Sequence, residues 1–141
     1  MRIISGNLKG KKLFFSNSKT TRPLRDLVKE SIFNVIIHSN LFRIKIENSF
    51  ILDLYSGIGS FGLEAISRGA SNVCFVENQK ETLNLLKKNI KSVDIHNKTR
   101  LFAKSINDFV NQSKSENEYD IIFCDPPFAE NHFINELKLI Q

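Results

Sequence analysis

The chain has 141 residues, a length that suits one domain with a sizeable core. Its hydrophobic content of 41% and charged content of 25% are typical of a globular protein, and no apolar run approaches the roughly 20 residues of a membrane span. No secretory signal is visible at the start, and two cysteines without metal-ligand spacing fit a reducing compartment, so we expect a cytoplasmic protein with no membrane partner and no metal site.

The net charge of +5 is concentrated at the start of the chain. Residues 1–30 carry eight basic and two acidic side chains, whereas the remaining 111 residues carry twelve and thirteen. A basic segment on a neutral domain favours a polyanionic partner, nucleic acid first. A solvated tail without a partner is the alternative. The candidate phosphate contacts are Lys9, Lys11, Lys12, Arg22 and Arg25.

A basic hairpin and a helix are the first predicted elements. Short β-type runs at 2–5 and 12–15 flank turn residues at Gly6, Asn7 and Gly10. Apolar residues then recur at spacings of three and four, which predicts an amphipathic helix over 23–38. Its expected buried face consists of Leu24, Leu27, Val28, Ile32 and Val35. We therefore predict an N-terminal arm over residues 1–22 and a second unit over 23–141.

Strands and helices alternate from residue 50 onwards. The expected strands cover 50–55, 72–76, 100–103 and 119–124, and the last is apolar enough to be buried on both faces. Helices are expected over 60–68 and 106–111 and near the end of the chain. Another helix is expected to begin after Asn78, which would cap it. This alternation predicts an α/β fold with a doubly wound, mostly parallel sheet.

A glycine-rich turn joins the first of these strands to its helix. Gly57, Gly59 and Gly62 form a G-x-G-x-x-G pattern shortly after Asp53. Such a turn lets the backbone approach a ligand closely, and the helix that follows presents unpaired N–H groups. Glu77, at the tip of the next strand, can accept both hydroxyls of a ribose. NAD and S-adenosylmethionine both fit this pattern, and a Glu that merely caps the next helix is the alternative.

A second motif, Asp125-Pro126-Pro127-Phe128, follows the fourth strand at the same edge of the sheet. Consecutive prolines stiffen the backbone and donate no N–H. The Asp125 side chain and the Pro126 carbonyl can therefore both accept hydrogens from one planar amine, while Phe128 stacks on its ring. This arrangement suits a nucleobase amino group and has no evident use in hydride transfer. A simple turn with an incidental Asp is the alternative.

These motifs resemble those of a known enzyme family. The stretch DLYSGIGSFGLEA resembles motif I of S-adenosylmethionine-dependent methyltransferases, and DPPF resembles the (D/N)PP(Y/F) motif of the amino-methylating members. The runs RIISGNLKGKKL, TRPLRDLVKESIFNVI and LEAISRGA are similar to the RsmD family of 16S ribosomal RNA (guanine-N2)-methyltransferases. The resemblance implies a Rossmann-like class I methyltransferase fold, S-adenosylmethionine as cofactor, and methylation of a guanine N2 in ribosomal RNA or an assembling small subunit by a monomer.

The resemblance also implies a role for each matching residue. Those that would bind the cofactor are Asp53, Gly57, Gly59, Gly62, Glu77, Asn78, Ser105 and Ile106. Those that would hold the flipped guanine are Asp125, Pro126, Pro127 and Phe128. Leu24 and Leu27 depart from the family pattern, which usually has Thr and a basic residue there.

The family pattern continues beyond Gln141 with a fifth strand and a final hairpin, so we expect the C-terminal strands of the fold to be missing. Without them, strand 119–124 would form a bare hydrophobic edge. Three other functions compete with the resemblance: a DNA adenine-N6 or cytosine-N4 methyltransferase, an inactive fragment that binds RNA through its arm, and an NAD-binding oxidoreductase.

Overall fold

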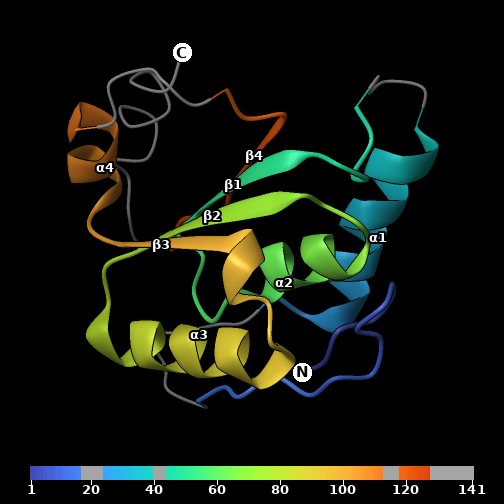
Figure 1. Cartoon of the computed structure of the whole chain (residues 1–141), viewed down its shortest axis with the longest axis horizontal. Coiled ribbons are helices and arrows are strands. Elements are labelled where there is room, and N and C mark those ends of the chain that lie inside the picture. Colours follow the sequence, from blue (N-terminus) through green and yellow to red (C-terminus); the bar gives the residue numbers. More distant parts are fainter. Residues whose placement is uncertain (17–23, 40–43, 113–117, 128–141) are drawn as a thin grey trace.

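The computed structural model describes residues 1–16, 24–39, 44–112 and 118–127 (Figure 1). Within these residues, a 4-stranded parallel sheet has the order β3-β2-β1-β4. Its strands are β1 (Phe50–Leu54), β2 (Asn72–Glu77), β3 (Thr99–Ala103) and β4 (Ile121–Cys124). The α-helices are α1 (Asp26–His38), α2 (Ser60–Ser67), α3 (Lys80–Val93) and α4 (Ile106–Gln112). A short 3-10 helix, η1 (His96–Lys98), precedes β3.

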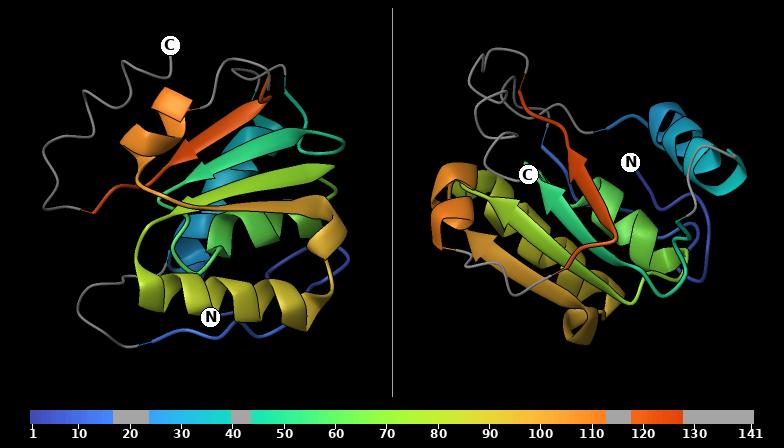
Figure 2. Two further views of the ribbon diagram at one scale, coloured as in Figure 1. Left: turned by 60° about the vertical axis from the view of Figure 1, so that its left-hand side comes forward. Right: turned by 90° about the horizontal axis from the view of Figure 1, so that it is seen from above.

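Helices cover both faces of the sheet, with α1, α2 and α3 on one side and α4 on the other (Figure 2). Side chains of a strand alternate between its faces. Ile51, Val73 and Phe75 accordingly belong to the core beneath α1–α3, whereas Leu52 and Cys74 pack with α4. This arrangement confirms the predicted doubly wound α/β sheet.

The helix predicted over 23–38 exists as α1, but its buried face differs from the prediction. Lys29 and Phe33 are wholly buried, whereas Leu27 is 78% exposed and Val35 is 52% exposed. Two apolar stripes run along this helix, and the stripe that meets the core is the one that contains Lys29. A lysine is buried there because Glu64 of α2 supplies an ion-pair partner, which sequence spacing does not reveal.

The N-terminal segment, residues 1–16, packs against the domain. An isolated antiparallel bridge joins Arg2 and Lys12, so the predicted hairpin pairing occurs without the two predicted strands. Ile3 and Leu13 are buried in the same core as α1–α3. The predicted boundary between residues 22 and 23 lies outside the described residues.

Two further predictions about local structure are wrong. Helix α3 begins at Lys80 without a side-chain cap, and Asn78 instead donates its backbone N–H to Glu77. Strand β4 is not buried on both faces, because Ile122 is 43% exposed. In the part of the chain that the structure describes, β4 pairs only with β1 and forms an edge. The helix predicted near the end of the chain lies outside that part.

No helix among the described residues is long and apolar enough to cross a membrane.

Candidate active site

The glycine turn occupies the carboxyl end of β1 and divides its three glycines between two tasks. Gly57 has a φ of +57°, and the space around its missing side chain is open apart from the Tyr55 carbonyl oxygen at 3.9 Å. A Cβ at Gly62 would lie 2.4 Å from the Phe75 ring, and one at Gly59 would lie 2.5 Å from Leu86. The first glycine therefore leaves the backbone accessible, whereas the other two let α2 pack closely on the sheet and on α3.

Asp53 shapes the turn from beneath. Its carboxylate is buried, and its Oδ2 accepts the backbone N–H of Gly62 at 3.0 Å. Burial raises the pKa of Asp53 to about 8, and the nearby charges of Asp125 and Glu77 add to this effect against the Gly62 hydrogen bond. Asp53 therefore anchors the start of α2 to the sheet.

This pKa predicts a pH-dependent stability. Between about pH 4 and pH 8, Asp53 is ionised in the unfolded chain but protonated in the folded one, so stability falls as pH rises through this window. One proton gives a slope approaching about 1.4 kcal/mol per pH unit. We expect Asp53→Asn, which keeps an acceptor for Gly62, to flatten this fall in urea titrations between pH 5 and 8. A variant as pH-sensitive as the parent would contradict the assignment, and Asp94→Asn, at an exposed carboxylate, is the control.

Glu77 joins the turn to the start of the next helix. Its Oε2 accepts the N–H of Gly57 at 2.9 Å, and its Oε1 accepts the N–H groups of Asn78 and Gln79 at 2.8 Å each. The helix-capping alternative is thus realised in part. A carboxylate has about four acceptor positions, and these three N–H groups occupy three of them, so one remains for a ligand hydroxyl. A second hydroxyl could be accepted only at the position that the Gly57 N–H now uses.

The Asp125-Pro126-Pro127 stretch lies at the same edge of the sheet as the glycine turn. Leu54, the last residue of β1, is in register with Val76 of β2 and with Cys124 of β4. The next residues of those two strands' segments are Glu77 and Asp125, so both lie just beyond the end of β1. Asp125 is exposed, and partial burial raises its pKa. The structure thus brings Asp53, Glu77 and Asp125 together. The charges of Glu77 and Asp125 favour a cationic ligand. Phe128 lies outside the described residues.

The residues expected near an adenine lie at the ends of β2 and β3. Asn78 is exposed beside Glu77. Ser105 caps α4, because its Oγ accepts the N–H of Asp108 at 3.1 Å and donates to that residue's carboxylate at 2.7 Å. Ile106 turns into the core beneath α4, so its side chain packs there. The predicted contact of Ile106 with an adenine could therefore involve only its backbone. Ser105 could contribute its backbone or its hydroxyl.

The basic residues predicted to contact phosphate lie on two stretches. Lys9, Lys11 and Lys12 are exposed on the N-terminal segment, and Arg25 is exposed directly before α1. Arg22 lies outside the described residues. The structure therefore places three of the five predicted contacts on one short run of chain.

A buried ion pair that sequence reasoning missed ties the N-terminal segment to α2. Lys29 Nζ lies 3.4 Å from Glu64 Oε2, both side chains are 0% exposed, and Lys29 also donates to the Arg2 carbonyl at 2.8 Å. The Glu64 carboxylate accepts the N–H groups of Ile4 and Ser5 at 2.8 and 2.9 Å and the Nε of Arg68 at 2.9 Å. Burial lowers the pKa of Lys29, and the charge of Glu64 opposes that shift. Lys29 lies in TRPLRDLVKESIFNVI and Glu64 in LEAISRGA, but neither stretch by itself indicates that the two residues pair.

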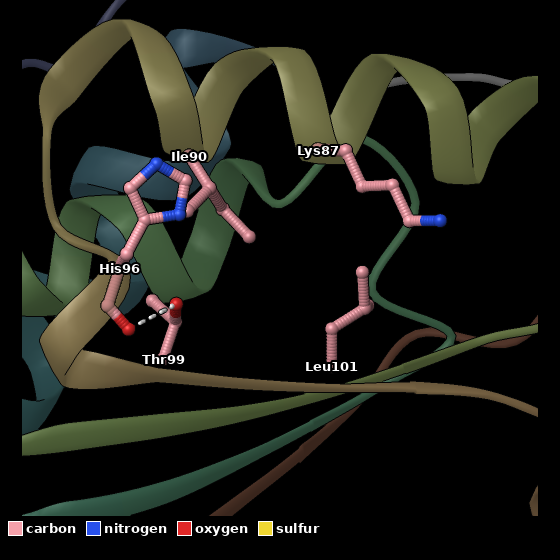
Figure 3. Close-up of a pocket in the computed structure, with 5 residues that line it drawn as sticks. All are labelled: Lys87, Ile90, His96, Thr99 and Leu101. Carbon is pink, nitrogen blue, oxygen red and sulfur yellow. Dashed lines mark hydrogen bonds between the residues drawn. The ribbon is translucent and has the colours of Figure 1, made fainter.

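Two pockets lie away from this edge of the sheet. One of about 240 Å³ lies between α3 and β3 and is lined by Lys87, Ile90, His96, Thr99 and Leu101 (Figure 3). The other, of about 300 Å³, lies beside β4, and its lining residues are Ile36, Ile44, Phe61, Asp120, Ile121, Ile122 and Phe123. Neither contains a predicted site residue. Among the described residues, no group of three His, Cys, Asp or Glu side chains is placed to hold a metal ion.

Comparison with known proteins shows what the chain is similar to. The family model described as Conserved hypothetical protein 95 matches residues 1–141. Ribosomal RNA small subunit methyltransferase D of Haemophilus influenzae is 38% identical over 132 residues, which cover 93% of this chain and 65% of that protein. The protein of the same name from Buchnera aphidicola is 36% identical over 139 residues, covering 99% and 69%.

The fold also matches a solved structure, that of yhhF from Escherichia coli. The TM-score is 0.82 at 28% sequence identity, over 99% of this chain and 71% of that one. The chain thus spans about two thirds of the length of the relatives and the structure that it matches. The predicted Rossmann-like methyltransferase fold is confirmed by this match and by the parallel sheet with helices on both faces.

Proposed function

The chain belongs to the family described as Conserved hypothetical protein 95, the RsmD family, and from this membership we propose that it methylates small-subunit ribosomal RNA with S-adenosylmethionine. The proposed acceptor is the exocyclic N2 of a guanine. One observation carries the proposal: the glycine turn, Glu77 and Asp125 meet at one edge of a parallel sheet. The relatives that carry this name have longer chains, of which this chain spans about two thirds, and the activity is proposed by analogy with those longer chains.

The residues at this edge fit S-adenosylmethionine. Gly57 leaves backbone space for close approach, and Glu77 retains acceptor capacity for a ribose hydroxyl. The carboxylates of Glu77 and Asp125 favour a ligand that carries positive charge, as a sulfonium does. The cofactor supplies an electrophilic methyl group when it is bound. A dinucleotide would bring two phosphate charges into the same field, which opposes the NAD alternative.

Asp125 and Pro126 would position the nucleobase amine. The Asp125 carboxylate and the Pro126 carbonyl each accept one hydrogen of the guanine N2, which fixes the direction of its lone pair. Both acceptors would stabilise the positive charge that grows on the nitrogen as it accepts the methyl group and the cofactor leaves as its thioether. Asp125 then takes the proton that the nitrogen loses, and its raised pKa suits this role. Such positioning contributes roughly several kcal/mol.

Access to Asp125 and Pro126 requires the guanine to leave its stack, at a cost of roughly a few kcal/mol. Phe128 is the predicted stacking partner that offsets this cost. The exposed lysines of the N-terminal segment are the predicted phosphate contacts, and their contribution should weaken as salt rises.

Titration calorimetry and labelled methyl transfer test the proposal. We expect the protein to bind S-adenosylmethionine in preference to NAD, and to transfer tritium from its methyl group to small-subunit ribosomal RNA or particles. Transfer to DNA alone would support the DNA methyltransferase alternative. RNA binding without cofactor binding would support the inactive RNA-binding alternative.

Glu77→Gln tests the ribose contact. The variant loses one acceptor oxygen and the charge, so we expect a cofactor affinity about 10- to 100-fold lower, as for a lost hydrogen bond to a charged group. S-adenosylhomocysteine and its 2′,3′-dideoxy analogue separate this role from a general loosening of the turn. The parent should prefer the ligand with hydroxyls, and the variant should bind both alike.

The matched control is Glu81→Gln, which changes an exposed carboxylate in the first turn of α3. It should leave both affinities unchanged. A Glu77→Gln protein that still discriminates between the two ligands would remove Glu77 from the ribose site.

A further inference from the structure

We propose that Phe14, Phe15 and Lys88 form a stacking platform for unpaired bases of the RNA strand that enters the site, an inference that rests on the proposed function. Both rings are half-exposed, at 43% for Phe14 and 47% for Phe15. They follow directly on Leu13, which is buried. Large apolar side chains that stay in solvent forgo the stabilisation that burial would provide. Two adjacent exposed rings therefore indicate a surface that binds a flat apolar partner.

The position of Phe14 is fixed by a wholly buried side chain. Asn89 of α3 accepts the Phe14 N–H at 2.7 Å and donates to the Phe14 carbonyl at 3.0 Å. Its remaining amide hydrogen reaches the carbonyl of Ile58, within the glycine turn, at 3.0 Å. Asn89 therefore holds the platform and the turn in one rigid unit, with the N-terminal segment running along α3 (Figure 2). Because the Phe14 backbone is held in this way, less freedom is lost when its ring stacks on a base.

Positive charge surrounds the platform. Lys88 Nζ lies 3.8 Å from the centroid of the Phe14 ring, and Lys11 and Lys12 are exposed on the same segment as the rings. Proteins that hold single-stranded nucleic acid combine these two features, with lysines on the phosphates and aromatic rings beneath the bases. A duplex offers no free base faces for stacking, so the chemistry favours an unpaired strand.

A tryptophan probe tests the contact directly, because the chain contains no tryptophan. In Phe14→Trp, excitation at the red edge of the absorption band reports on this single indole. We expect a 12-nucleotide oligouridylate to quench its emission, since a stacked base lies against the ring. Val35→Trp, at an exposed apolar position on α1, is the matched control and should not be quenched.

Binding of the same oligonucleotide, followed by fluorescence anisotropy, separates stacking from charge. Phe14→Ala/Phe15→Ala should weaken binding by roughly 5- to 150-fold per stacked base and leave the slope of log affinity against log salt unchanged. Lys88→Gln should lower that slope by about 0.7. Leu27→Ala, which removes an exposed apolar side chain of α1, should change neither quantity.

Three outcomes would overturn the platform: unchanged affinity in the double alanine variant, equal quenching in both tryptophan proteins, or binding to phosphatidylglycerol vesicles in place of RNA. Failure of the proposed function looks different. Quenching by RNA in a protein that binds no S-adenosylmethionine would keep the platform and remove the methyltransferase assignment. Full methyl transfer with unchanged RNA affinity in Phe14→Ala/Phe15→Ala would support the methyltransferase assignment and remove the platform.

Discussion

Asp125→Ala is expected to lower the rate of methyl transfer by roughly 10²- to 10⁴-fold while the affinity for S-adenosylmethionine stays within about twofold of the parent. Asp125 follows the strand end in register with that of β1, and it is exposed, so its removal leaves no cavity in the core. The loss therefore falls on orientation of the amine and on acceptance of its proton. Single-turnover rates and calorimetry on the same protein measure the two quantities separately.

Asp125→Asn refines this test. The amide keeps an acceptor oxygen but cannot take the proton, so its rate should lie between those of the parent and Asp125→Ala. Glu118→Ala, at an exposed carboxylate ahead of β4, is the control and should match the parent. Equal losses of rate and cofactor affinity in Asp125→Ala would contradict the role assigned to Asp125.

The second large effect concerns stability. Glu64→Ala is expected to lower the free energy of unfolding by about 3–5 kcal/mol, because it leaves Lys29 buried without a charge partner. The backbone N–H groups of Ile4 and Ser5 lose their acceptors as well. Denaturant unfolding measures the loss. Hydrogen exchange should show the amides of Ile4 and Ser5 becoming less protected than those of β1.

A double-mutant cycle assigns this loss to the ion pair. Lys29→Met in the Glu64→Ala background should cost much less than it does alone, since the charge that Glu64 compensates is already unpaired. Glu30→Ala, on an exposed face of α1, controls for changes in helix propensity. A loss below about 1 kcal/mol in Glu64→Ala would mean that water replaces the carboxylate, and that other contacts, such as burial of Ile3 and Leu13, hold the N-terminal segment.

Local patterns predicted the centre of the fold. The apolar runs of β1 and β2, the glycines between β1 and α2, and the helical spacing of α3 all act over a few residues, so the sequence displays them directly. Parallel pairing then brings the strand ends to one edge, which is why Glu77 and Asp125 could be predicted at a common site.

Long-range polar contacts could not be predicted in this way. Lys29 and Glu64 are 35 positions apart, and Asn89 bonds to Phe14 across 75 positions. Burial of Lys29 depends on that distant partner. The apolar spacing of α1 therefore predicted Leu24 and Ile32 at the core correctly, but it also placed Leu27, Val28 and Val35 there, which are exposed. The basic side chains of the N-terminal segment likewise suggested a separate arm, whereas Ile3 and Leu13 bury it against the domain.

The identity of the methylated nucleoside tests the central claim most directly. Small-subunit ribosomal RNA that lacks the modification would be incubated with the protein and methyl-labelled S-adenosylmethionine, digested to nucleosides, and analysed by mass spectrometry. The account predicts that the label appears in N2-methylguanosine and that Asp125→Ala abolishes it. Label in a methylated adenosine or cytidine, or on a carbon atom or a ribose, would contradict the role proposed for the Asp125-Pro126 acceptors.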